Sequence, residues 1–163
     1  MVIFLKMSKT PIIIMGVFLL GIHSLYSQPK NTTFNLNDII SQNSQFDLFY
    51  DDKDLADTYA EELSLIITDK LSQRNVSINY PVEFNTVKTA EINTINDYVS
   101  KNSNAIVLHI VSQSSSTRNN IKGVFYYNSK LIGSFSSYRT IWNNNRLILL
   151  GEFIAEKISE KTN

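Results

Sequence analysis

The sequence predicts an α/β (α+β) fold, with a mixed β-sheet of about five strands and helices packed mainly on one face. Three observations support this prediction. Residues 46–50 and 76–84 alternate apolar and polar side chains with the period of a strand. Residues 55–73 and 147–158 place apolar side chains at helical spacing. Residues 105–111 are apolar almost throughout, as in a strand buried on both faces.

The first strand and the first helix follow one another directly. A polar lead-in over 28–44 precedes the strand 46–50. Four aspartates come next, and negative charge is favoured at the positive end of a helix dipole. We therefore expect Asp54 to cap an amphipathic helix over 55–73. The four aspartates are Asp51, Asp52, Asp54 and Asp57.

The second strand and the second helix are predicted less sharply. Pro81 lies inside the strand 76–84 and has no backbone donor, so this strand is expected at or near a sheet edge. A helix then begins after Thr86 or Thr89, each of which can cap it, and ends at 102–104.

The second half of the chain predicts the centre of the sheet and a hairpin. The apolar strand 105–111 is expected at the centre, and a polar loop over 112–120 follows it. Residues 123–127 and 131–142 then form a β-hairpin that turns at 128–130.

An amphipathic helix closes the chain. The asparagines at 143–145 are expected to cap it, and its apolar stripe runs over 147–158. The predicted order is strand, helix, strand, helix, three strands, helix, with the helices on one face of the sheet. No linker divides 45–163, so this range is expected to be a single domain.

The first 27 residues are typical of a secretory signal peptide. Lys6 and Lys9 precede an apolar run over 12–22, which is shorter than the roughly 20 residues that a membrane-spanning helix needs. We expect cleavage between Ser27 and Gln28, with an uncleaved N-terminal anchor as the alternative. The protein is therefore predicted to be exported, to the periplasm or beyond the cell, with no stable membrane span after cleavage.

Composition excludes several classes of protein. The chain has no cysteine, so it carries neither disulfides nor a lipid-bearing cysteine. Without Lys6 and Lys9 the 15 basic residues fall to 13 against 15 acidic ones, a net charge near −2. This charge does not indicate nucleic-acid binding.

Charge is distributed unevenly along the chain. Acidic residues crowd 47–62, whereas none lies between Asp97 and Glu152. Six basic residues occupy that acid-free interval: Lys101, Arg118, Lys122, Lys130, Arg139 and Arg146. Either the two halves neutralise each other or are simply solvated, or a basic sheet face meets an acidic partner.

The residues give little sign of catalysis or of a bound cofactor. His109 is the only histidine left after cleavage, and its apolar strand predicts a buried or pleat-facing ring with a hydrogen-bond partner. A catalytic role would need a nucleophile and an orienting group beside it. The aspartates after the first strand fit helix capping better than a cation site, because no glycine lies between Gly21 and Gly123 to bend a calcium loop. We expect no metal and no cofactor.

The hairpin region combines aromatic and basic side chains. Such residues commonly anchor protein interfaces, although one face of a hairpin is usually core. The candidate binding residues are Tyr126, Tyr127, Tyr138, Arg139 and Trp142. Their expected partner is another envelope protein, met through this hairpin or through a sheet edge.

Four segments together carry a family resemblance: 62–76, 95–111, 123–138 and 147–157. In element order and hydrophobic pattern they resemble the N-terminal domain of TolB and the CsgG-like and LpoB-like accessory domains of the bacterial envelope. The resemblance implies an accessory role in the envelope and carries over no functional residue.

Together these observations predict an exported, non-catalytic binding or accessory protein of the cell envelope. Two alternatives stay open at this point. One is a small secreted hydrolase that uses His109. The other is a soluble carrier of a small ligand, with its pocket between the sheet and the helices.

Overall fold

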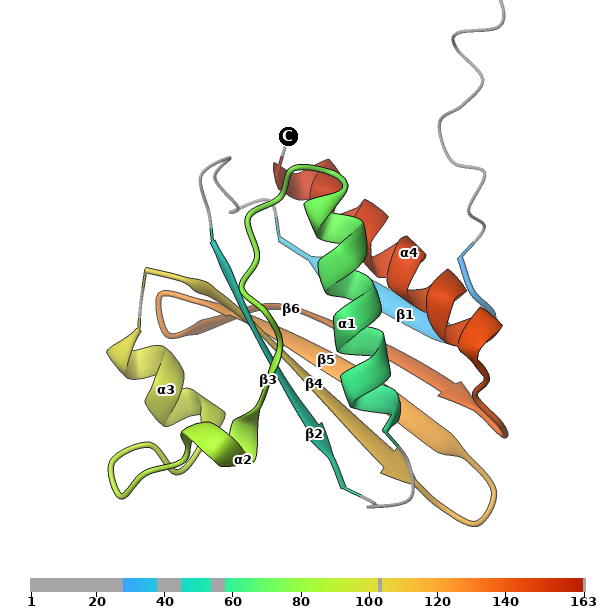
Figure 1. The fold of residues 1–163 in the computed structure, drawn as a ribbon, viewed down its shortest axis with the longest axis horizontal. Helices are drawn as coiled ribbons and strands as arrows, with labels where there is room; N and C mark the ends of the chain where they lie inside the picture. The colour runs from blue at the N-terminus through green and yellow to red at the C-terminus, as the bar shows by residue number, and fades with distance from the viewer. Residues whose placement is uncertain (1–27, 38–44, 54–57, 103, 163) are drawn as a thin grey trace, which may run out of the picture.

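Six strands and four helices make up the part of the chain that the computed structural model describes, residues 28–37, 45–53, 58–102 and 104–162 (Figure 1). In chain order they are β1 (Thr32–Leu36), β2 (Phe46–Asp52), α1 (Tyr59–Ser72), β3 (Val82–Glu83), α2 (Phe84–Val87), α3 (Ile95–Lys101), β4 (Ile106–Ser114), β5 (Asn119–Tyr127), β6 (Lys130–Arg139) and α4 (Asn144–Thr162). The predicted α+β class is confirmed, with one strand more than expected.

The strands form one mixed sheet in the order β1-β6-β5-β4-β2-β3. The neighbouring pairs β1–β6, β6–β5 and β5–β4 run antiparallel, whereas β2 runs parallel to both β4 and β3. β4 and β5 therefore lie at the centre, as predicted for 105–111. β3 lies at one edge, as the proline at position 81 predicted.

The additional strand, β1, forms the other edge and lies inside the segment expected to be a polar lead-in. Three of its five residues are polar, so the sequence lacks the apolar alternation that predicts a strand. Phe34 nevertheless packs on the main core, with its ring 5.9 Å from that of Phe125. The buried hydroxyls of Thr32 and Ser137 share a hydrogen bond of 2.7 Å.

The two long helices, α1 and α4, pack side by side on one face of the sheet (Figure 1). Leu63 of α1 and Leu150 of α4 are fully buried in the main core, and each such side chain contributes about 1.5–3 kcal/mol. Gly151 allows the helices to approach closely, because a Cβ there would lie 2.4 Å from Cγ2 of Ile66.

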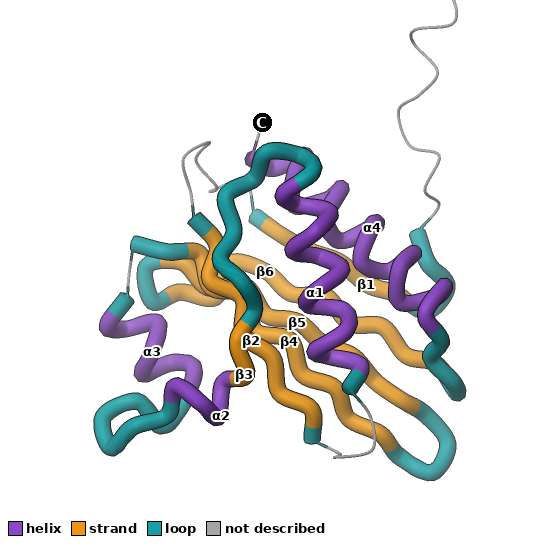
Figure 2. Tube along the Cα trace, in the orientation of Figure 1, coloured by secondary structure: helices purple, strands orange, loops and turns teal. Residues whose placement is uncertain are grey.

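The short helices α2 and α3 lie on the opposite face, over β2 and β4 (Figure 2). Phe49 of β2 is the centre of this second cluster, with ring centroids 5.8 Å from Phe84 and 4.7 Å from Tyr98. The expectation that all helices share one face therefore holds only for the long ones. β2 and β4 are apolar on both faces, so each face needs cover.

Several boundaries differ from the predicted ones. The strand expected over 76–84 is reduced to β3 and one isolated bridge between Phe46 and Ile78. α3 begins after Thr94, whose side chain forms a capping box with Asp97, and not after either of the two threonines predicted to cap it. α1 is described only from Tyr59 onward, so the predicted capping residue lies outside the described residues.

The hairpin is confirmed, with a first strand that begins earlier than predicted and a second that ends at Arg139, before the predicted end at 142. β4 and β5 continue into the expected polar loop and narrow it to a turn that Ser115 closes by accepting a hydrogen bond from the backbone of Arg118. β5 and β6 turn at Asn128 and Ser129, which have φ of 49° and 59°. Asn143 begins α4 as expected, since its side-chain oxygen accepts from the backbone N–H of Arg146 at 3.0 Å.

Candidate functional site

The structure separates the five aromatic and basic residues predicted to bind a partner. Tyr127 packs against the main core, and Trp142 is 4% exposed, with its indole N–H donating to the carbonyl of Asn119. Tyr126 packs on the second cluster, where burial raises the pKa of its hydroxyl. Of the five, Tyr138 and Arg139 line a cavity at the end of β6.

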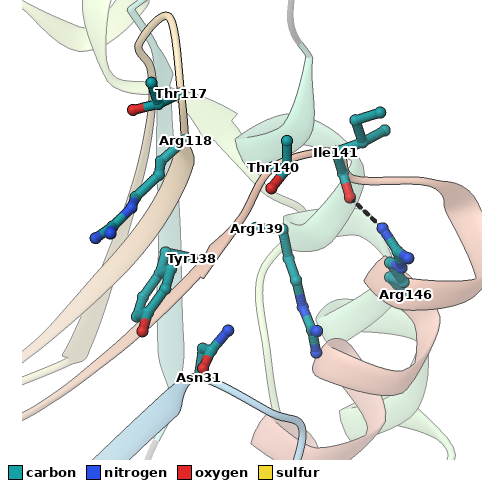
Figure 3. Close-up of a pocket in the computed structure, with 8 residues that line it drawn as sticks. All are labelled: Asn31, Thr117, Arg118, Tyr138, Arg139, Thr140, Ile141 and Arg146. Carbon is teal, nitrogen blue, oxygen red and sulfur yellow. Dashed lines mark hydrogen bonds between the residues drawn. The ribbon is translucent and has the colours of Figure 1, made fainter.

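This cavity has a volume of about 400 Å³ and is polar. It lies where the β4–β5 turn, the end of β6 and the start of α4 meet the residue before β1. Its lining residues are Asn31, Thr117, Arg118, Tyr138, Arg139, Thr140, Ile141 and Arg146 (Figure 3). No acidic side chain is among them.

Three arginines surround the cavity, and each is held by a neighbouring group. Arg118 stacks 5.2 Å from the ring centroid of Tyr138, and Arg139 lies 5.9 Å from that of Trp142. Arg146 donates to the carbonyl of Ile141 at 2.6 Å (Figure 3). The guanidinium groups are thus oriented by aromatic rings and a carbonyl, without any carboxylate.

The described residues provide no counter-charge for these arginines. Within the described residues, no carboxylate lies at ion-pair distance from any of the three. The Nε atom of Arg139 is buried and has no hydrogen-bond partner among the described residues. A guanidinium in this state favours an anion from outside the chain.

Three aspartates of the acid-rich segment, in contrast, bond to groups other than the arginines of the cavity. Asp52 accepts hydrogen bonds from two backbone N–H groups at the start of α1. Asp47 accepts from Tyr98 and Asn79, and Asp51 pairs with His109. These aspartates therefore do not neutralise the basic half of the chain.

His109 has the partner that its sequence context predicted. Its Nε2 lies 2.8 Å from Oδ2 of Asp51, and its ring centroid lies 5.6 Å from that of Phe84. Burial lowers the pKa of His109, and the hydrogen bond to Asp51 opposes this effect in part. Among the described residues, the carboxylate of Asp51 is the hydrogen-bond partner of the ring.

A second, more apolar cavity of about 240 Å³ lies on the face of β4 and β5 turned away from α1 and α4. It is lined by Lys53, Val111, Gln113, Asn120, Lys122 and Val124. This cavity is therefore not the pocket between the sheet and the helices that the carrier alternative predicted. The described residues contain no group of three or more side chains suited to hold a metal ion.

The sequence does not single out Arg118 and Arg146 as site residues. Both belong to the acid-free interval, but they lie 28 positions apart and nothing local links them. The pairing of Asn119 with Arg139 across β5 and β6 brings the turn and the strand end together. Only the sheet register therefore shows that these residues share a cavity.

Comparison with known proteins finds a likeness of fold. No protein-family model and no curated protein sequence matches the chain. Two solved structures of PelC from Paraburkholderia phytofirmans, one of them a point variant, match with a TM-score of 0.50 each at 9% and 10% sequence identity. Each match covers 80% of this chain and 96% of the PelC chain, and both structures are described as dodecamers. At this identity the likeness establishes the fold alone.

Proposed function

We propose that the protein is an exported, non-catalytic accessory protein of the cell envelope that acts by binding proteins, copies of itself among them. The observation that carries this proposal is the position of β1 at the edge of the sheet. No described strand lies beyond it. An unpaired edge strand offers a row of backbone donors and acceptors to another chain.

The register of β1 indicates which of its groups are available. Asn31 and Asn37 bond to β6 through their backbones, so the odd-numbered residues of the strand face β6. The backbone N–H groups of Thr32, Phe34 and Leu36 therefore point outward. The exposed side chains of Thr33 and Asn35 lie on the uncovered face of the sheet.

Two further observations support the proposal. The PelC structures that share this fold are dodecamers, which favours self-association of this chain as well. The apolar run within residues 1–27 favours export, and no helix in the described ranges is long and apolar enough to cross a bilayer. Residues 1–27 lie outside the described residues, so the signal peptide, like the resemblance to TolB-type and related domains, stays a prediction.

The mass of the purified chain in solution, measured by light scattering, tests self-association. We expect a multiple of the protomer mass that falls to one protomer in a Thr33→Lys, Asn35→Lys double variant, because lysines on an edge oppose strand pairing. Asn96→Lys, an exposed site on α3, is the matched control and should leave the mass unchanged. A monomer at all concentrations in the unaltered chain contradicts the proposal.

The hydrogen bond between His109 and Asp51 favours a second candidate function, a hydrolase. Under the binding proposal, His109→Ala leaves the rate of cleavage of simple chromogenic esters at the background of buffer, as in the unaltered chain. Cleavage that is well above background and is lost in His109→Ala, with the fold retained by circular dichroism, would establish the enzyme instead.

A further inference from the structure

The arginine cavity at the end of β6 carries an inference beyond self-association. We propose that it binds the oxyanion group, a carboxylate or a phosphate, of a small anionic ligand. Figure 3 shows Arg118 beside Tyr138 at one end of the cavity and Arg146 at the other, with Arg139 between them. Three cationic side chains that line one cavity raise the local concentration of anions.

Hydrogen-bond donors are available at the cavity. Each guanidinium has five N–H donors in a planar fork that matches a carboxylate or phosphate. The cation–π contacts of Arg118 with Tyr138 and of Arg139 with Trp142 do not consume N–H donors in conventional hydrogen bonds. Arg146 uses one donor on the carbonyl of Ile141, which holds its remaining donors in place.

The environment favours a charged occupant over water alone. Arg139 is partly buried and lines the cavity, and no carboxylate of the described residues lies at ion-pair distance from its guanidinium group. The three arginines also have no acidic neighbour in the sequence, since no Asp or Glu lies between Asp97 and Glu152.

The size and the neutral lining indicate that the ligand is more than a single ion. A volume of about 400 Å³ far exceeds the share of one water molecule, roughly 30 Å³. Asn31, Thr117 and Thr140 line the cavity with amide and hydroxyl groups that can bond a polar ligand body. We therefore expect a polyvalent anion to bind more tightly than a monovalent one.

Titration calorimetry of the purified chain with citrate and with inorganic phosphate tests the proposal, and sodium chloride at equal ionic strength is the control for screening. We expect saturable binding of at least one anion, with citrate alone assigning carboxylate chemistry and phosphate alone assigning phosphate chemistry. An Arg118→Ala, Arg146→Ala double variant should raise the Kd for the anion at least about tenfold, because it removes two charge-assisted contacts. Arg139→Lys keeps the charge at the partly buried position. It should therefore raise the Kd less than the double variant does.

Arg74→Ala is the matched control, since Arg74 follows α1 and does not line the cavity. Its Kd should equal that of the unaltered chain. No heat beyond that of chloride, or equal weakening by Arg74→Ala and by the double variant, overturns the proposal. Light scattering on the same samples separates the two proposals. If the chain binds the anion but has the mass of one protomer, self-association is contradicted and anion binding is not.

Discussion

At the scale of single residues, Asp52 shows how the charged segment after β2 is used. Its carboxylate accepts from the backbone N–H groups of Ala60 at 2.8 Å and Glu61 at 3.1 Å, and also from the hydroxyl of Ser112. It thereby satisfies the first turn of α1 from a neighbouring strand, while Thr58 in the cap position makes no such bond. The sequence predicted this role for the segment and assigned it to the next aspartate along the chain.

Asp52→Ala should lower the free energy of unfolding by about 1–3 kcal/mol, because it removes the carboxylate that satisfies two helix N–H groups. Chemical denaturation measures this loss. Asp69→Ala, at an exposed position on α1, is the control and should change stability by less than about 0.5 kcal/mol. Equal effects of the two substitutions would show that the carboxylate of Asp52 does not hold the helix.

At the scale of elements, the long helices and the hairpin were predictable from the sequence because periodicity and turn residues are local signals. α1, α4 and the turn at Asn128 and Ser129 lie where the pattern placed them. β1 was not predictable, since a strand with three polar residues is defined by its pairing with β6. The face on which α3 packs also depends on tertiary contact, through Phe49 and Val99.

Thr94→Ala should destabilise α3 by removing its capping box, which should lower the free energy of unfolding by about 1 kcal/mol. Hydrogen bonds from Thr94 also lower the pKa of Asp97, so this pKa should rise in the variant. NMR titration of the Asp97 carboxyl and hydrogen exchange within α3 measure the two effects. Asn96→Ala, which leaves the cap intact, should leave the pKa of Asp97 in place, and a shift as large as that in Thr94→Ala would refute the assignment.

At the scale of the whole molecule, the two ends of the sheet differ in how their charges are used. Around β2 the acids bond to a helix start, a histidine and a tyrosine, whereas around the end of β6 the arginines have no carboxylate partner among the described residues. The sequence predicted the uneven charge but not the cavity that gathers the arginines, because that depends on strand register. An exposed edge at β1 lies beside this cationic end of β6.

Stability should fall as the pH drops below about 6.5, the ordinary pKa of histidine. Burial lowers the pKa of His109, so the unfolded chain binds a proton that the folded chain does not, and folding loses up to about 1.4 kcal/mol per pH unit in that window. Denaturation between pH 7 and pH 5.5 measures the slope, which should shrink in His109→Gln. The same slope in His109→Gln as in the unaltered chain would remove His109 as its cause.

Hydrogen exchange at the β1 edge tests most directly whether the protein acts by binding through this strand. In a lone protomer the outward amides of Thr32, Phe34 and Leu36 have no strand partner among the described residues and should exchange rapidly. We predict that these three amides become protected as protein concentration rises, while the amides of the exposed β3 edge do not. Rapid exchange of all three at every concentration, in a sample whose inner strands are protected, would contradict the account.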